Sequence, residues 1–139
     1  YNIAIHIRRG DIIQKKGTNP NLQMRYLDNQ YYYNALQTVL EYVKDQSNIH
    51  IYLFSQGEKE DFMEFSQCTN VHFCLDMDGQ SSFLHMVYAD VLITSRSSFS
   101  YKPALLNRGI KFCPRDFWHG YPKSDDWILL DEKGKIVER

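Results

Sequence analysis

The sequence of 139 residues lacks any apolar run near the ~20 residues of a membrane-spanning helix, and nothing in it has the form of a secretory leader. The chain also lacks a large net charge of either sign, because its formal net charge is -1. A general binder of nucleic acid or of membrane surfaces is therefore not expected. Only three cysteines are present, with no C-x-x-C pair, which argues against a zinc knuckle and against a disulfide framework.

Several sequence motifs of well-known sites are absent as well. The chain has neither G-x-G-x-x-G nor G-x-x-x-x-G-K-[ST], so it carries neither the dinucleotide fingerprint nor a P-loop. There is no H-E-x-x-H and no clustered set of His, Cys and Asp, so no metal site is expected. No G-x-S-x-G elbow supports a serine hydrolase.

What the chain does contain is an alternation of strand-like and helix-like segments. Its size fits one domain, and its 43% hydrophobic and 24% charged residues are ordinary for a globular protein. Strands are expected at residues 3–7, 50–54, 71–75, 91–94, 110–113 and 127–130. Strands alternating with helices at this spacing predict an α/β fold with a doubly wound, mostly parallel sheet. The common strand order of such a sheet is 3-2-1-4-5, with its switch point between strands one and four.

The helix boundaries carry their own local signals. Asp28 can cap a helix whose apolar side chains recur at helical spacing from Tyr32 to Val43. Ser55-Gln56-Gly57-Glu58 has the form of a capping box and predicts a second helix start. Pro103 is expected in the first turn of a later helix, and Asn107–Gly109 is typical of a left-handed helix stop.

The first strand ends in the most informative stretch, Tyr1–Asp11, which reads YNIAIHIRRGD. Alternation along a strand places Ile3, Ile5 and Ile7 on one face and points His6 and Arg8 together on the other. The carboxyl end of a parallel strand is where α/β proteins bind ligands. Arg8 and Arg9 at this end predict an anion clamp, and phosphate is the anion most often held this way.

A second loop should meet the first at the switch point between strands one and four. Ser95–Ser100 forms a serine-rich turn at a helix start, with hydroxyl and backbone N–H donors. Arginines on one side and a helix N-terminus on the other would hold a diphosphate, so a phosphate-bearing nucleotide is the expected ligand.

Structural alternatives exist for each of these residues. His6 can be a satisfied core histidine, and Arg8 can form a salt bridge to Asp11 or Asp76. The tripeptide Arg9-Gly10-Asp11 spells an adhesive motif, but a place beside the core argues against display. The serines can simply cap the helix, which applies to Ser95, Ser97 and Ser98.

These residues resemble conserved peptides of a known enzyme family. His6-Ile7-Arg8-Arg9-Gly10-Asp11 is similar to the HxRRxD peptide of the α1,2-, α1,6- and protein O-fucosyltransferase superfamily. The likeness continues, in the same order, through four further blocks: Tyr32–Leu36, Ile51–Ser55, Ala89–Ser100 and Phe117-Trp118. It covers roughly residues 2–118, and the Ser95–Ser100 block makes it specific.

The resemblance implies the C-terminal, Rossmann-like half of a GT-B-like glycosyltransferase that transfers L-fucose from GDP-fucose to a glycan acceptor with inversion. Catalysis in that family needs no metal or other cofactor. Arg8 would contact the donor diphosphate and stabilise the leaving group, with Arg9 second to it. His6 would help to place the nucleotide, and phosphate contacts would come from Ser95, Ser97 and Ser98. Residues 1–139 would then be one donor-binding domain of a larger enzyme.

The sequence departs from the family pattern in ways that matter for chemistry. Asp11 is the only acid near the motif and is the candidate base. Guanine recognition is expected from Asp76 or Asp78, whose carboxylates can accept hydrogen bonds from the N–H groups of the base. A non-catalytic nucleotide or nucleotide-sugar binding module is the second hypothesis for the chain. The compartment stays open, with the Golgi or ER lumen expected in a eukaryote and the cytoplasm in a bacterium.

Overall fold

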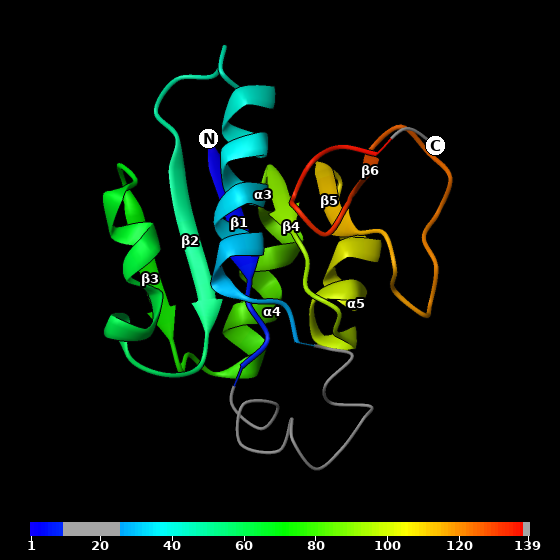
Figure 1. Ribbon diagram of the computed structural model, residues 1–139. Helices are drawn as coiled ribbons and strands as arrows, with labels where there is room; N and C mark the ends of the chain where they lie inside the picture. The colour runs from blue at the N-terminus through cyan, green and yellow to red at the C-terminus, as the bar shows by residue number, and fades with distance from the viewer. Residues whose placement is uncertain (10–25, 138–139) are drawn as a thin grey trace.

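A computed structural model describes residues 1–9 and 26–137 of the chain. Within them lies a single six-stranded sheet in which every pair of neighbouring strands is parallel, in the order β3-β2-β1-β4-β5-β6 (Figure 1). The strands are β1 (Asn2–His6), β2 (His50–Ser55), β3 (Val71–Leu75), β4 (Val91–Ile93), β5 (Ile110–Pro114) and β6 (Trp127–Leu130). The predicted α/β fold with a doubly wound parallel sheet is confirmed, and β6 extends the assumed order.

Helices cover both faces of this sheet. Helix α3 (Asn29–Tyr42) and the 3₁₀ helix η1 (Lys59–Gln67) lie on one face, while α4 (Gly79–Tyr88) and α5 (Ser98–Leu106) lie on the other (Figure 1). Strand order reverses at β1, which pairs with β2 on one side and with β4 on the other. The carboxyl ends of β1 and β4 therefore lie side by side, as the switch point of a doubly wound sheet requires.

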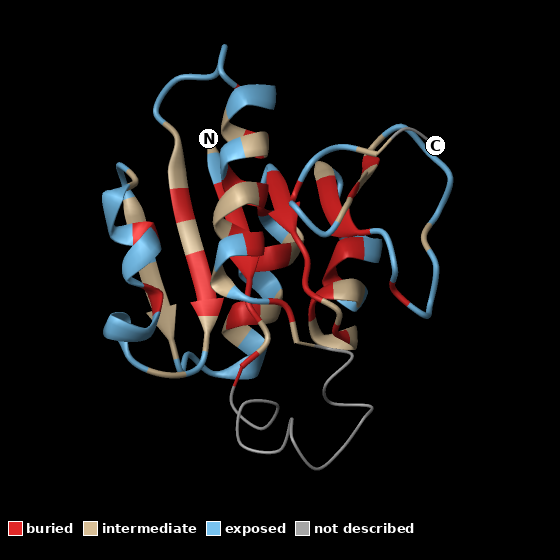
Figure 2. Ribbon diagram, in the orientation of Figure 1, coloured by how far each residue is buried: buried red, intermediate tan, exposed pale blue. Residues whose placement is uncertain are grey.

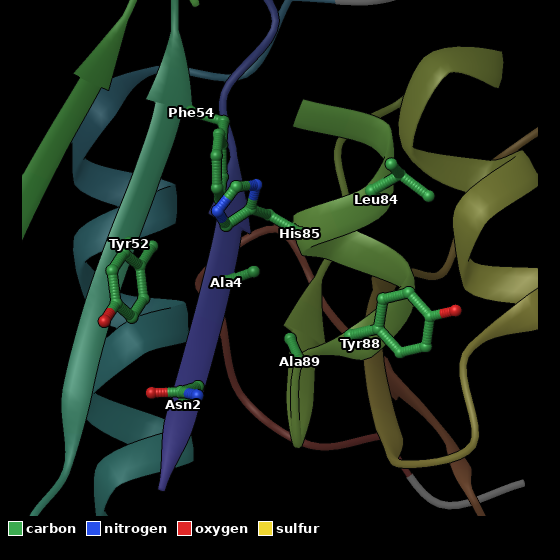
Figure 3. Close-up of a pocket in the computed structure, with 8 residues that line it drawn as sticks. All are labelled: Asn2, Ala4, Tyr52, Phe54, Leu84, His85, Tyr88 and Ala89. Atoms are coloured by element: carbon green, nitrogen blue, oxygen red, sulfur yellow. The ribbon is translucent and has the colours of Figure 1, made fainter. Parts of the chain in front are cut away.

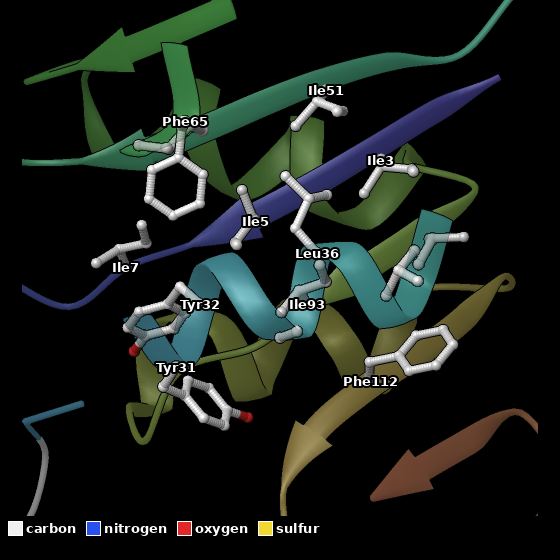
Figure 4. Packing of buried hydrophobic residues seen from close by; sticks show 14 of the residues in the cluster. Ile3, Ile5, Ile7, Tyr31, Tyr32, Leu36, Ile51, Phe65, Ile93 and Phe112 are labelled. Carbon is white, nitrogen blue, oxygen red and sulfur yellow. The ribbon is translucent and has the colours of Figure 1, made fainter. Parts of the chain in front are cut away.

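The core forms where the apolar faces of the strands meet the helices. Burial is concentrated in the central strands and the helix faces that pack on them (Figure 2). Ile3, Ile5 and Ile7 point together toward α3, where they meet Leu36 and the buried ring of Tyr32 (Figure 4). Ala4, on the opposite face of β1, packs with the α4–α5 side instead. The predicted alternation along β1 is confirmed.

Local signals define α3 as the sequence predicts. The Asp28 carboxylate accepts a hydrogen bond from the backbone N–H of Tyr31 at 2.9 Å, so it caps the helix. Tyr32, Leu36 and Val39 are buried along one stripe. This stripe presses α3 onto β1 and holds the start of the helix next to the end of that strand.

Three boundary predictions are wrong. Ser55 belongs to β2, and η1 begins later, with Glu58 and Asp61 forming the capping box after Gly57 turns the chain at φ 123°. Pro103 lies inside α5 rather than in its first turn, because Ser97 already caps the helix. Asn107 has an extended backbone, so no left-handed stop occurs there. Its side-chain amide instead donates to Met86, Val87 and Ala89 carbonyls.

Candidate functional site

The site is built on the segment that leaves β1. The backbone N–H of Ile7 donates to the carbonyl of Phe54 at 3.0 Å, and the Ser55 hydroxyl donates to the carbonyl of Ile7 at 2.6 Å. These two bonds tie the chain to β2 one residue beyond the end of β1. Arg8 and Arg9 therefore start from a fixed backbone position at the carboxyl edge of the sheet.

His6 is buried against the turn that follows β4. Its Nδ1 lies 2.8 Å from the hydroxyl of Ser95, which in turn lies 3.1 Å from the hydroxyl of Ser100. The Ser95 backbone N–H also donates to the Ser100 hydroxyl at 3.0 Å. The ring of Phe99 meets the imidazole edge-on, with centroids 5.3 Å apart. The structure thus brings His6 and Ser95 into direct contact across the switch point.

Burial sets the protonation state of this histidine. Removal from water lowers the pKa of His6 to about 3, and the positive charge of Arg8 acts in the same direction. The imidazole is therefore neutral at physiological pH. It can use its second ring nitrogen as a hydrogen-bonding group without adding a positive charge to the site.

Arg8 lies opposite the start of α5. Its guanidinium nitrogen Nη1 donates to the hydroxyl of Ser97 at 3.5 Å. That hydroxyl also accepts a hydrogen bond from the backbone N–H of Phe99 at 3.2 Å and so caps α5. Within the described residues, no hydrogen bond uses the backbone N–H groups of Ser97 and Ser98. A guanidinium facing a helix N-terminus is an arrangement suited to an anion.

Arg9 is held by the protein itself. Its guanidinium is buried, donates to the Asn29 side-chain oxygen at 2.6 Å and to the Arg8 carbonyl at 2.7 Å. It also lies over the rings of Tyr26 and Tyr32, 4.8 and 5.7 Å from their centroids. These contacts join the loop after β1 to the start of α3. They assign Arg9 a structural task in addition to its place in the wall of the site.

A cavity of about 190 Å³ opens between these groups, on the side of β2 and α4. No carboxylate of the described residues lines it. Its walls contain the predicted residues His6, Arg8 and Arg9. The other lining residues are Ile7, Phe54, Ser55, Gln56, Met77, Gly79, Ser82 and Phe99. A cavity whose wall combines two arginines with aromatic and polar side chains suits a ligand with both an anionic and an aromatic part.

Two of the three predicted acidic residues lie outside the cavity wall. Asp76 is exposed at the end of β3, at φ 56°, and is not part of the cavity wall, although Met77 beside it is. Asp78 caps α4 by accepting a hydrogen bond from the backbone N–H of Ser81 at 2.9 Å, and this bond lowers the pKa of its carboxyl. Asp11 lies outside the described residues. The roles of Asp11 and Asp76 therefore stay predictions.

A larger cavity, of about 340 Å³, lies where α4 crosses β1 and β2 (Figure 3). Its walls are mainly apolar and aromatic, with Tyr52 and Phe54 on β2 facing His85 and Tyr88 on α4. None of the arginines that the structure describes lines it. Because charged and polar groups converge at the smaller cavity instead, the smaller one is the candidate functional site.

Residues 1–9 and 26–137 contain no group of three or more His, Cys, Asp or Glu side chains that could hold a metal ion. Among the same residues, no helix has the length and apolar character needed to cross a membrane.

Some residues of the site carry no strong sequence signal. Phe99 and Ser100 belong to the Ser95–Ser100 block, but only the structure shows that Phe99 packs on His6 and that Ser100 bonds Ser95. Ser82 in α4 and Gln56 directly after β2 line the cavity, but the sequence marks neither as a site residue, because Gln56 stands out only as part of the Ser55–Glu58 capping-box pattern. Comparisons with protein-family models, curated proteins and solved structures find no match to this chain.

Proposed function

We propose that this chain is the donor-binding domain of a glycosyltransferase that transfers L-fucose from GDP-fucose to a glycan acceptor with inversion. One observation carries the proposal: Arg8 and His6 at the end of β1 face the capped N-terminus of α5 across the switch point of a parallel sheet. This geometry suits a nucleoside diphosphate, and the order of the blocks in the sequence favours GDP-fucose among such ligands.

The chemistry follows from where charge develops. As the bond from the sugar to the diphosphate breaks, negative charge accumulates on the departing phosphate and the sugar becomes oxocarbenium-like. A fixed guanidinium at Arg8 stabilises that charge more strongly in the transition state than in the ground state. The imidazole of His6 is held by Ser95 and orients the nucleotide. Because the imidazole is neutral, it does not compete with the Arg8 guanidinium for the negative charge of the phosphate.

A second candidate function is binding of a nucleotide sugar without transfer. It is favoured by the absence of a carboxylate from the described walls of the cavity, because an inverting transfer needs a general base for the acceptor hydroxyl. Binding of GDP by the complete protein, with neither transfer of fucose nor hydrolysis of the donor, would select this function.

Calorimetric titration of the chain with GDP, and with UDP and ADP as controls, tests the proposal. We expect GDP to bind and the two controls to bind at least about tenfold more weakly, a difference of ~1.4 kcal/mol. Binding of none of the three nucleotides would overturn a nucleotide-binding function. Equal binding of all three would overturn the assignment of the donor to GDP-fucose.

A further inference from the structure

A cluster of aromatic side chains lies beside the start of α5, on the opposite side from the candidate cavity. It consists of Tyr101 in α5 and Phe117, Trp118 and His119 after β5, and it is called the aromatic platform below. The platform follows the carboxyl end of β5, so it lies at the same edge of the sheet as Arg8 and Ser97. The segment between β5 and β6 runs beside α5 (Figure 1).

One part of the platform is buried and another part is exposed to solvent. Phe117 is buried, and below it the Tyr121 hydroxyl donates to the carbonyl of Pro114 at 2.7 Å. The rings of Tyr101 and His119 are almost parallel, at 14° with centroids 5.3 Å apart. Trp118, whose ring centroid lies 4.4 Å from that of Phe117, is 46% exposed. Such rings present a preorganised aromatic surface to solvent.

Direct contacts connect the platform to the anion site. The Nε2 atom of His119 lies 3.4 Å from the hydroxyl of Ser98, the first residue of α5. The preceding residue, Ser97, accepts the hydrogen bond from Arg8. A diphosphate held between Arg8 and the start of α5 would therefore have the cavity on its β2 side and the platform on its β5 side.

The two sides differ in the chemistry they can accept. The cavity, with Phe54, Met77 and Phe99 in its walls, suits the planar base of a nucleoside. The group at the other end of the diphosphate must then extend toward the platform. A pyranose has C–H faces that pack on aromatic rings and hydroxyls that hydrogen-bond at their edges, and His119 offers a ring nitrogen there.

We propose that the aromatic platform binds a pyranose ring next to the diphosphate site. The inference rests on the proposed function and adds a sugar subsite to it. The pyranose can come from the nucleotide-sugar donor or from the acceptor glycan, and both sources share the same recognition chemistry. Trp118 and His119 are the residues whose removal separates the sugar subsite from the anion site.

The test compares ligands with and without a sugar on the native chain, on Trp118→Ala and on His119→Ala. Tyr88→Ala is the matched control. Tyr88 is an aromatic residue that is 79% exposed, and it lies at the C-terminal end of α4, whereas Gly79 at the other end of this helix lines the candidate cavity. Calorimetry measures the affinity of each variant for GDP, for GDP-fucose, and for lactose when the protein is saturated with GDP. Near-native GDP affinity in a variant shows that its fold and anion site are intact.

If the platform binds the donor sugar, the native protein binds GDP-fucose more tightly than GDP. Aromatic contacts of this kind predict a gain in affinity of about two- to tenfold, and Trp118→Ala should remove it. If it binds the acceptor, Trp118→Ala weakens lactose by a similar factor and leaves GDP-fucose unchanged. Either result supports the pyranose subsite. Unchanged affinity for both sugars in Trp118→Ala and His119→Ala overturns it. Failure of native protein to bind GDP is a different result, because it refutes the proposed function itself.

Discussion

Replacement of His6 by asparagine should remove a large part of the acid sensitivity of the fold. Burial lowers the pKa of His6 to about 3 in the folded chain, and the charge of Arg8 adds to the effect, whereas an ordinary histidine has a pKa of 6.5. Between these two values the unfolded chain binds the proton and the folded chain does not. The stabilising contribution is therefore fully present above about pH 6.5 and is lost as the pH falls toward 3.

The size of the effect follows from the same two values. With these folded and unfolded pKa values, the histidine lowers the free energy of unfolding by about 1.4 kcal/mol when the pH falls from about 7.5 to about 5.5. Because His6 is almost completely buried, solvent screening does not reduce the figure much. Asparagine keeps a polar atom near Ser95 and removes the titrating group, so His6→Asn should lack this loss.

Urea denaturation at the two pH values measures the effect. Contributions of the other titratable groups are common to both chains and cancel in the difference between native protein and His6→Asn. An equal loss of stability in the native chain and in His6→Asn would refute the buried, neutral state of His6.

Two further substitutions test the packing and the anion site. Lys111→Met should lower the free energy of unfolding by about 2–3 kcal/mol, because the Lys111 ammonium is buried and donates to the carbonyls of Asn107 and Gly109 and, at 2.6 Å, to Asp126. A change below about 0.5 kcal/mol in chemical denaturation would contradict that role. Ser97→Asp should still cap α5, so the protein should keep its native melting temperature. The variant should bind pyrophosphate at least about tenfold more weakly, because it places a carboxylate beside Arg8. Unchanged pyrophosphate affinity would place the anion elsewhere.

Much of the fold was accessible from the sequence because its signals are local. The alternation of apolar residues in β1 and the helical spacing of α3 each follow from a single periodicity, and the structure confirms both. The boundary errors arise where two local signals compete. Ser55 fits a capping box in the sequence, yet its backbone pairs with β3 and its hydroxyl donates a hydrogen bond to the carbonyl of Ile7. The helix therefore starts only after Gly57.

The site was partly accessible for a similar reason. His6, Arg8 and Ser97 come from strand ends and a helix start, which a doubly wound topology brings together. The wall formed by Gln56, Met77 and Ser82 depends on how α4 sits against β2, which no periodicity encodes. Arg8 and Arg9 look equivalent in the sequence. They separate only in three dimensions, where Asn29 and two tyrosine rings hold Arg9.

The central claim, that Arg8 holds the diphosphate of a guanine nucleotide, is tested most directly by the GDP affinity of Arg8→Ala. A charged hydrogen-bond donor of this kind contributes about 1.5–3 kcal/mol, so GDP should bind about 10- to 150-fold more weakly to the variant. Arg115→Ala removes an equal charge from an exposed pair with Glu132 and should bind GDP like the native chain. A folded Arg8→Ala variant with native GDP affinity would contradict the account.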